Sequence, residues 1–146
     1  MKLLAVASGG GHWVQLLRLR PAFEGTQIEW LSTQPDYAGD VPEKLHVVPD
    51  ANQWQKWRML LMFSLVAWVM LKVRPDVVVT TGAAPGFAAV LWGRLLGART
   101  VWVDSIANSE ELSGAGAKVG RLAHVWLTQW EHLARPGGPE YWGAVV

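Results

Sequence analysis

A glycine-rich segment near the start of the chain has the residue types of a substrate-binding loop. Residues 8–12 have the sequence SGGGH, and they lie between the apolar run 3–7 and a helical pattern. Backbone amides at such a junction can hold an anion. The segment does not match G-x-G-x-x-G, and no acidic residue ends the next apolar run, 28–31, which disfavours a dinucleotide site. The loop residues that we expect to bind substrate are Ser8, Gly9, Gly10 and Gly11.

His12 ends this loop and is the strongest candidate for a catalytic base. Histidine is the side chain that most often takes up a proton in catalysis near neutral pH. An isolated histidine more commonly caps or packs a helix, and that is the alternative here. The position of His12 at the sheet edge where open α/β folds bind ligands favours the catalytic role.

Two more segments with chemical potential follow later strands. The sequence TGAAPG, which contains Gly82, follows one expected strand, and Asp104 and Ser105 follow the next. Because the carboxyl ends of parallel strands meet at one edge of a sheet, we expect these loops to face one crevice. Gly82 and Ser105 are expected to bind substrate, and Asp104 to orient the imidazole of His12 or bind a sugar hydroxyl. The alternatives are that the glycine only shapes a turn and that Asp104 is structural.

The sequence lacks the motifs of several common kinds of catalytic and metal-binding site. The chain has no cysteine, which excludes disulfides, thiolate metal sites and cysteine nucleophiles. It also lacks D-x-D, H-E-x-x-H, a Walker lysine motif and the G-x-S-x-G elbow. Its 13 basic and 12 acidic side chains give a net charge of +1 and no broad basic surface. We therefore expect no metal, no resident cofactor and no nucleic-acid partner.

Apolar runs alternate with helical patterns along the chain, which positions these segments at one sheet edge. Strands are expected at 3–7, 28–31, 45–48, 76–80, 99–103 and 125–128. Helices are expected after residue 12 as far as Pro21, at 52–73, 86–96 and 117–122, and from residue 130, with loops at 32–44 and 136–139. The alternation predicts one doubly wound α/β domain over residues 1–146, with strand 76–80 beside the first strand.

The helical segment 52–73 is apolar on every face, more than packing on a sheet requires. Thirteen residues separate Arg58 from Lys72, which as a helix is ~20 Å, too short for a hydrocarbon core of ~30 Å. Tryptophans and basic residues at its start are typical of an interfacial anchor. The alternative is a buried crossover helix or one covered by a second subunit. The residues expected to contact a membrane or partner are Trp54, Trp57, Arg58, Phe63 and Trp68.

Five segments, taken in order, resemble one enzyme family. They are ASGGGH at 7–12, TGAAP at 81–85, VWVDS at 101–105, LTQW at 127–130 and YWG at 141–143. Together they resemble the membrane-associated, acceptor-side subunit of split two-chain UDP-sugar glycosyltransferases. These comprise a bacterial exopolysaccharide type and a related membrane subunit of the N-acetylglucosaminyltransferase of dolichol-linked oligosaccharide synthesis. The resemblance covers nearly the whole chain.

The resemblance implies that this chain is one half of a two-chain enzyme. The chain would form the N-terminal, Rossmann-like half of a GT-B transferase, and a separate chain would bind the UDP-sugar. The heterodimer would transfer the sugar, with inversion and without a metal, to a polyprenyl-pyrophosphate-linked glycan at the cytoplasmic membrane face. His12 matches a histidine in the acceptor cleft of such enzymes, and Asp104 matches their acidic strand end. Eukaryotic members carry a membrane-spanning N-terminal helix that is missing here, so peripheral or monotopic attachment is expected through residues 54–74 or the partner.

Two other functions fit the same sequence. One is a stand-alone Rossmann-like domain that binds a nucleotide in the same crevice without a second chain. The other is a membrane scaffold that recruits the catalytic partner and contributes no chemical group. Substitution of His12 separates the scaffold from the enzyme subunit, because a scaffold does not depend on an imidazole.

Overall fold

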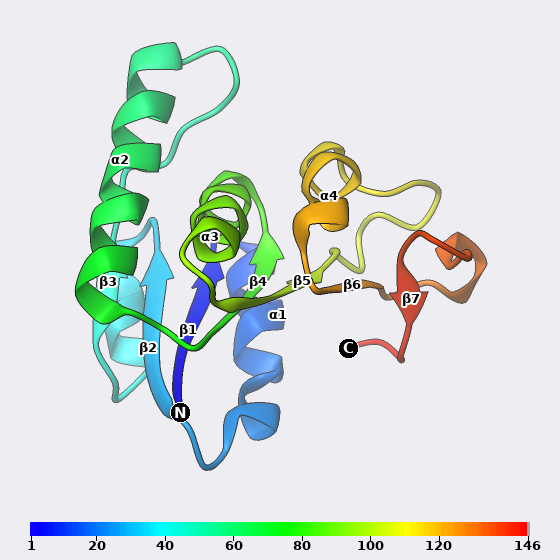
Figure 1. Ribbon diagram of the computed structural model, residues 1–146, viewed down its shortest axis with the longest axis horizontal. Helices are drawn as coiled ribbons and strands as arrows, with labels where there is room; N and C mark the ends of the chain where they lie inside the picture. The colour runs from blue at the N-terminus through cyan, green and yellow to red at the C-terminus, as the bar shows by residue number, and fades with distance from the viewer. Residues whose placement is uncertain (146) are drawn as a thin grey trace.

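One seven-stranded parallel sheet forms the centre of the computed structural model, which describes residues 1–145 (Figure 1). The strand order is β3-β2-β1-β4-β5-β6-β7. The strands are β1 Lys2–Ala7, β2 Gln27–Ser32, β3 Leu45–Val47, β4 Val77–Gly82, β5 Arg99–Val103, β6 Val125–Thr128 and β7 Glu140–Tyr141. This confirms the predicted doubly wound, Rossmann-like α/β fold. The last residue of the predicted domain, 146, lies outside the described residues.

The first strand is the centre of the topology. β1 pairs in parallel with β2 on one side and with β4 on the other, as predicted for strand 76–80. The sheet therefore reverses its winding between β1 and β4, and in open α/β sheets ligands bind outside the carboxyl ends of strands at such a point. The apolar runs in β1 and β4 are buried because helices cover both faces of the sheet.

Helices divide between the two faces of the sheet. The helices are α1 Gly11–Arg18, α2 Lys56–Val73, α3 Ala84–Leu95 and α4 Gly114–Val119, with short 3-10 turns η1 Arg20–Phe23, η2 Pro35–Asp40, η3 Gly120–Leu122 and η4 Glu131–Leu133. Trp13 and Leu16 of α1 pack with Trp30 on one face. α2 and α3 cover the other face, where their side chains pack with those of β1, β2 and β4.

Three differences from the sequence prediction have a local cause: the starts of two helices and one additional strand. α2 begins at Lys56 rather than at residue 52, because Asn52 and Gln55 exchange hydrogen bonds in a turn before it. α4 begins three residues earlier than expected, at Gly114, because the hydroxyl of Ser113 caps it by accepting from the Gly116 amide. The strand β7 was not predicted, because two residues between prolines and glycines carry no periodicity.

The expected loop 32–44 contains η2 and is fixed to the body of the protein. Tyr37 stacks on Trp13 with ring centroids 4.7 Å apart, and the indole of Trp13 donates to Asp40 at 2.9 Å. Glu43 accepts two hydrogen bonds from Arg20, at 2.9 and 2.6 Å, and one from the Trp30 indole at 3.0 Å. The bonds from Arg20, followed by the indole bond, lower the pKa of Glu43 to about 2.

The Glu43 carboxylate is expected to make folding stability sensitive to acid. Its pKa is depressed in the folded state, so it stabilises the protein above the unfolded pKa near 4.5, and this contribution is lost as pH falls towards about 2. Glu43→Gln should therefore flatten the fall in unfolding free energy below about pH 4.5. Urea titrations of both proteins between neutral pH and pH 3 measure this, and curves that stay parallel contradict it.

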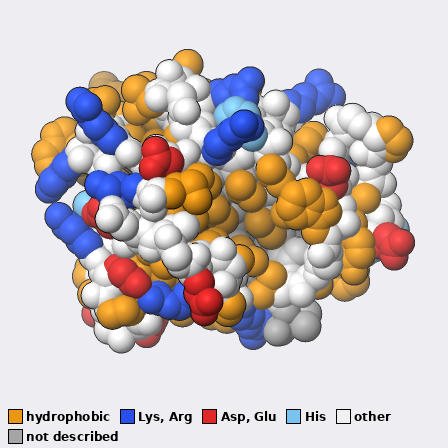
Figure 2. Space-filling view, turned by 60° about the horizontal axis from the view of Figure 1, so that its bottom comes forward, with side chains coloured by type: hydrophobic (Ala, Val, Ile, Leu, Met, Phe, Trp, Pro, Cys, Tyr) orange, Lys and Arg blue, Asp and Glu red, His pale blue; other side chains and the backbone are white. Residues whose placement is uncertain are grey.

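Charged side chains of both signs are mixed on the face shown in Figure 2, with hydrophobic side chains between them. This mixture agrees with the net charge of +1. A face of this kind has no extended patch of one sign for a phosphate backbone.

Candidate functional site

The two glycine-bearing loops are joined by hydrogen bonds at the carboxyl ends of β1 and β4. The amide of Ser8 donates to the carbonyl of Gly82 at 2.8 Å, and the amide of Ala83 donates to the hydroxyl of Ser8 at 3.1 Å. The hydroxyl of Thr81 donates to the carbonyl of His12 at 2.6 Å. The structure therefore brings Ser8, Gly82 and His12 together, as the topology argument predicts.

The imidazole of His12 has a defined orientation at this junction. Its Nδ1 lies 2.9 Å from the carbonyl oxygen of Thr81, and the side chain is half-buried. A carbonyl only accepts, so Nδ1 carries a proton in this contact and the neutral ring presents its lone pair at Nε2. A backbone carbonyl thus assigns the tautomer that a general base requires.

Gly82 allows the His12 ring to approach the end of β4. Its φ of +110° lies in a region that favours glycine, and a Cβ added there would lie 3.1 Å from two atoms of the imidazole. The absence of a side chain at Gly82 therefore sets the position of the ring, a role that goes beyond shaping a turn.

Gly82→Ala is expected to displace the His12 ring and to cost about 1–3 kcal/mol of stability, because backbone strain is added to a tight contact. Thermal unfolding measures the stability, and the ring's chemical shifts by NMR report its displacement. Gly97→Ala is a matched control, because Gly97 also has a positive φ, of +85°, but no atom within 4 Å of an added Cβ. Unchanged imidazole shifts in Gly82→Ala would contradict the proposed contact.

A large hollow of about 1090 Å³ opens beside the joined loops. Ser8, Gly9 and Gly10 form part of its polar lining. Ala83 and Ala84, at the start of α3, also line the hollow. Its apolar lining comes from Trp54 just before α2, from Met59 and Phe63 of α2, and from Phe87 of α3. The rings of Phe63 and Phe87 lie 6.0 Å apart. The hollow is therefore amphipathic. Of the predicted substrate-binding residues, Ser8, Gly9 and Gly10 line it, whereas Gly11, Gly82 and Ser105 do not. The predicted catalytic residues, His12 and Asp104, are not part of its lining either.

Asp104 belongs to a different network from the one predicted. It is 1% exposed, and its carboxylate accepts from the Trp102 indole at 3.0 Å and from the Ser113 amide and hydroxyl at 2.9 and 2.6 Å. The orienting partner of His12 is Thr81, so the expectation that Asp104 orients the imidazole is wrong in this geometry. Asp104 instead fixes Ser113, the residue that caps α4, and α4 is one wall of the hollow.

Ser105 also has a structural environment. Its hydroxyl accepts from the side chain of Gln15 at 3.1 Å and from the amide of Ala107 at 3.2 Å. Gln15 in turn accepts from the buried amide of Gln129 at 2.6 Å, so α1, the loop after β5 and the end of β6 share one polar network. Binding of substrate by Ser105 stays a prediction.

The outer side of α2 presents a continuous apolar surface to solvent. Trp57 is 85% exposed and Trp68 58% exposed, and Trp54 just before the helix is 82% exposed. Arg58 donates from its guanidinium to the carbonyl of Asp50, so it fixes the turn before α2. None of the helices that the structure describes has the length and apolar content needed to cross a bilayer.

Sequence reasoning missed several residues of the site. Tyr37 accepts from the Gly10 amide at 2.9 Å, and no sequence signal marks it because it comes from the segment expected to be a loop. Thr81 stood within a recognised motif but was given no role. Met59, Phe87 and Lys118 line the hollow, and only the apolar character of their helices could have suggested the first two.

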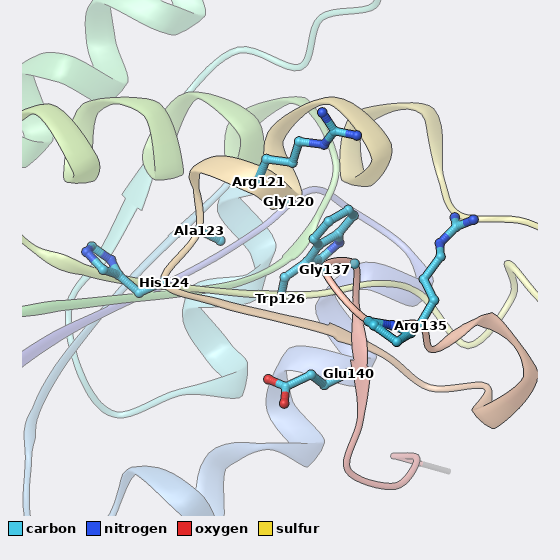
Figure 3. A pocket seen from close by; sticks show the side chains of 10 residues that line it. Gly120, Arg121, Ala123, His124, Trp126, Arg135, Gly137 and Glu140 are labelled. Carbon is cyan, nitrogen blue, oxygen red and sulfur yellow. The ribbon is translucent and has the colours of Figure 1, made fainter.

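A second, smaller hollow of about 420 Å³ lies where the chain enters β6 and β7 (Figure 3). Arg121, Trp126 and Arg135 line it, and it shares no lining residue with the larger hollow. In Figure 3 the side chains of Arg121 and Arg135 extend to the opposite side of β6 from that of Glu140. Among residues 1–145, no group of three or more His, Asp or Glu side chains could hold a metal ion.

The sequence and the fold of this chain were compared with those of known proteins. No family model matches the sequence. The chain is 27% identical to mouse UDP-N-acetylglucosamine transferase subunit ALG14 over 170 aligned positions, which cover 91% of this chain and 77% of that protein. The chain is thus similar in sequence to a subunit of a glycosyltransferase.

Solved structures share the fold. Acinetobacter baumannii MurG superimposes on 95% of this chain with a TM-score of 0.77 and 18% identity. UDP-N-acetylglucosamine 2-epimerase from Rickettsia bellii superimposes on 90% with a TM-score of 0.70 and 14% identity. The chain spans 45% of the first protein and 39% of the second. Its fold is the Rossmann-like α/β fold present in these larger proteins.

Proposed function

We propose that this chain is the acceptor-side subunit of a heteromeric glycosyltransferase that moves a sugar from a UDP-sugar to a polyprenyl-pyrophosphate-linked glycan in polysaccharide synthesis. The observation that carries the proposal is His12, whose Nδ1 is held by the Thr81 carbonyl at the topological switch point. His12 ends the loop whose Ser8, Gly9 and Gly10 line the amphipathic hollow. The similarity to a transferase subunit supports the same reaction class. A separate chain supplies the UDP-sugar site in this proposal, so the two chains form a heterodimer.

The proposed reaction is an inverting displacement. The acceptor hydroxyl attacks the anomeric carbon, its new C–O bond forms, and the bond from that carbon to the diphosphate of UDP breaks. Nε2 of His12 takes the proton of the hydroxyl, while the Thr81 carbonyl holds the ring. On this chain the step uses no metal and no resident cofactor, since charge on the leaving group is balanced by backbone amides and the partner.

The hollow suits a lipid-linked acceptor because its two kinds of lining match the two parts of such a molecule. The polar side, with Ser8 and Gly10, is suited to the diphosphate and first sugar, and the start of α1 provides a favourable dipole. The apolar side, with Phe63 and Phe87, is suited to the first prenyl units. Trp54 belongs both to the hollow and to the exposed surface, so a lipid chain can pass between them without crossing water.

The exposed side of α2 is the proposed contact with the cytoplasmic face of the membrane, in a peripheral or monotopic manner. Leu60, Leu61 and Leu71 continue the line of exposed apolar side chains from Trp57 to Trp68. Lys72 lies 4.9 Å above the Trp68 ring and adds a positive charge at the end of this line. Tryptophan and cationic side chains on one apolar helix face are typical of interfacial binding.

The double substitution Trp57→Ser and Trp68→Ser is expected to weaken binding to phosphatidylglycerol-containing vesicles by ~10-fold or more. Burial of half of each indole contributes roughly 2 kcal/mol. Both side chains are exposed, so thermal stability should not change. Vesicle sedimentation measures the binding, and Val14→Ser, at an exposed position of α1 on the other face of the sheet, is the control. Equal sedimentation of the double variant and the control would place the membrane contact elsewhere.

The proposed function is tested by reconstitution. The tagged chain is purified from its native membranes in mild detergent, and a stoichiometric second chain is identified by mass spectrometry and co-expressed with it. Transfer of radiolabelled sugar from UDP-sugars to native lipid extract by the pair, and by neither chain alone, is the expected result. Tight nucleotide binding by an isolated monomer, without transfer in any combination, would instead favour the stand-alone binding domain.

A further inference from the structure

We propose that Lys118 recognises the diphosphate of the acceptor, an inference that rests on the proposed function and adds a residue to its site. Lys118 comes from α4, a helix for which the sequence suggested no role. It lines the same hollow as Ser8, Gly9 and Gly10 of the first glycine loop.

The charged side chains around the hollow favour binding of an anion on its α4 side. The charged side chains in its lining, within residues 1–145, are Lys118 and Asp50. Asp50 comes from the segment before α2, and Figure 1 shows α2 and α4 on either side of α3. A phosphate group is attracted towards Lys118 and repelled from Asp50, so the diphosphate is oriented within the hollow.

The ammonium group of Lys118 is free to bind an anion. In the described part of the chain the ion pairs join Arg20 to Glu43 and His46 to Glu29, and neither involves Lys118. The other α4 residues in the lining, Gly114 and Ala115, are small and leave room around the lysine.

Several backbone amides at the polar side of the hollow already donate within the protein. The amide of Gly10 already donates to the hydroxyl of Tyr37 at 2.9 Å, and the amide of Ala83 donates to Ser8 at 3.1 Å. With the amide of Ser8, which donates to the carbonyl of Gly82, three amides at the polar side of the hollow are used within the protein. A diphosphate with several acceptor oxygens needs a further donor with positive charge, and Lys118 provides it.

The proposal is tested by titrating the chain with farnesyl diphosphate and with farnesol in the same detergent. The wild-type protein should bind the diphosphate more tightly than the alcohol. Lys118→Ala should weaken binding of the diphosphate by ~10-fold or more, which is typical for loss of a hydrogen bond to a charged group, and should leave farnesol binding unchanged. Lys118→Arg should retain most of the affinity. The salt dependence of diphosphate binding should also decrease in Lys118→Ala.

Arg121→Ala is the matched control, because Arg121 is an exposed cation three residues further on and lines the second hollow instead. Equal weakening by Lys118→Ala and Arg121→Ala would show a general surface potential and overturn the proposal. Unchanged diphosphate binding in Lys118→Ala, with discrimination kept in the wild type, would overturn it and leave the proposed function intact. Failure of the wild-type protein to bind either lipid would remove the acceptor site from this hollow, and with it both proposals.

Discussion

His12→Ala is expected to lower sugar transfer by the proposed two-chain enzyme by ~10²–10⁴-fold, the usual contribution of a general base. The loss should appear in kcat, because in the proposed reaction the base acts on the acceptor proton during the displacement. The physical reason for this effect is the contact of His12 Nδ1 with the Thr81 carbonyl, which leaves the lone pair of Nε2 to accept the proton. Steady-state transfer of radiolabelled sugar to saturating lipid acceptor measures the effect.

A conservative variant controls for the loss of the Thr81 contact. His12→Gln can still donate a hydrogen bond to the Thr81 carbonyl through its amide, but it offers no basic nitrogen. It should therefore be as inactive as His12→Ala while unfolding at the same temperature as the wild type. Both variants should still assemble with the donor-binding chain. Full activity in either variant would remove His12 from the chemistry and favour the scaffold function.

Much of the fold follows from the sequence because its strands are continuous apolar runs. Strands 99–103 and 125–128 were predicted at their observed bounds, since parallel strands buried on both faces require such runs. The start of α4 was missed because Gly114 and Gly116 resemble a loop until Ser113 caps them. The meeting of the two glycine-bearing loops also followed from topology, because parallel strands all end at the same sheet edge.

The hydrogen-bond partners within the site could not be predicted, because they depend on where individual side chains turn. Asp104 and Thr81 end neighbouring strands, and spacing alone gives both access to His12. The structure shows that the Asp104 carboxylate faces Trp102 and Ser113, and that a backbone carbonyl, which has no sequence signature, holds the imidazole. The lining of the hollow by Tyr37 and Lys118 likewise depends on loops whose path periodicity does not encode.

Asp104→Ala is expected to destabilise the protein by about 3 kcal/mol or more. It removes the acceptor of three hydrogen bonds, from the Trp102 indole and from the amide and hydroxyl of Ser113. Each buried donor left without an acceptor costs about 1–3 kcal/mol. Urea unfolding should show a lower midpoint with an unchanged m-value. Asp104→Asn should lose less, because its carbonyl oxygen still accepts, and stabilities equal to the wild type in both variants would contradict the network.

Kinetics of the same variants separate the structural role of Asp104 from a catalytic one. If Asp104 holds α4 through Ser113, loss of its carboxylate loosens the wall of the hollow that carries Lys118. At a temperature where Asp104→Ala is still folded, the KM for lipid acceptor should then rise while kcat stays within a few fold of the wild type. An Asp104 that oriented the imidazole would give the opposite result, a fall in kcat at constant KM, because only the transition state would be affected. The expected retention of kcat follows from Thr81, which continues to hold His12 when Asp104 is absent.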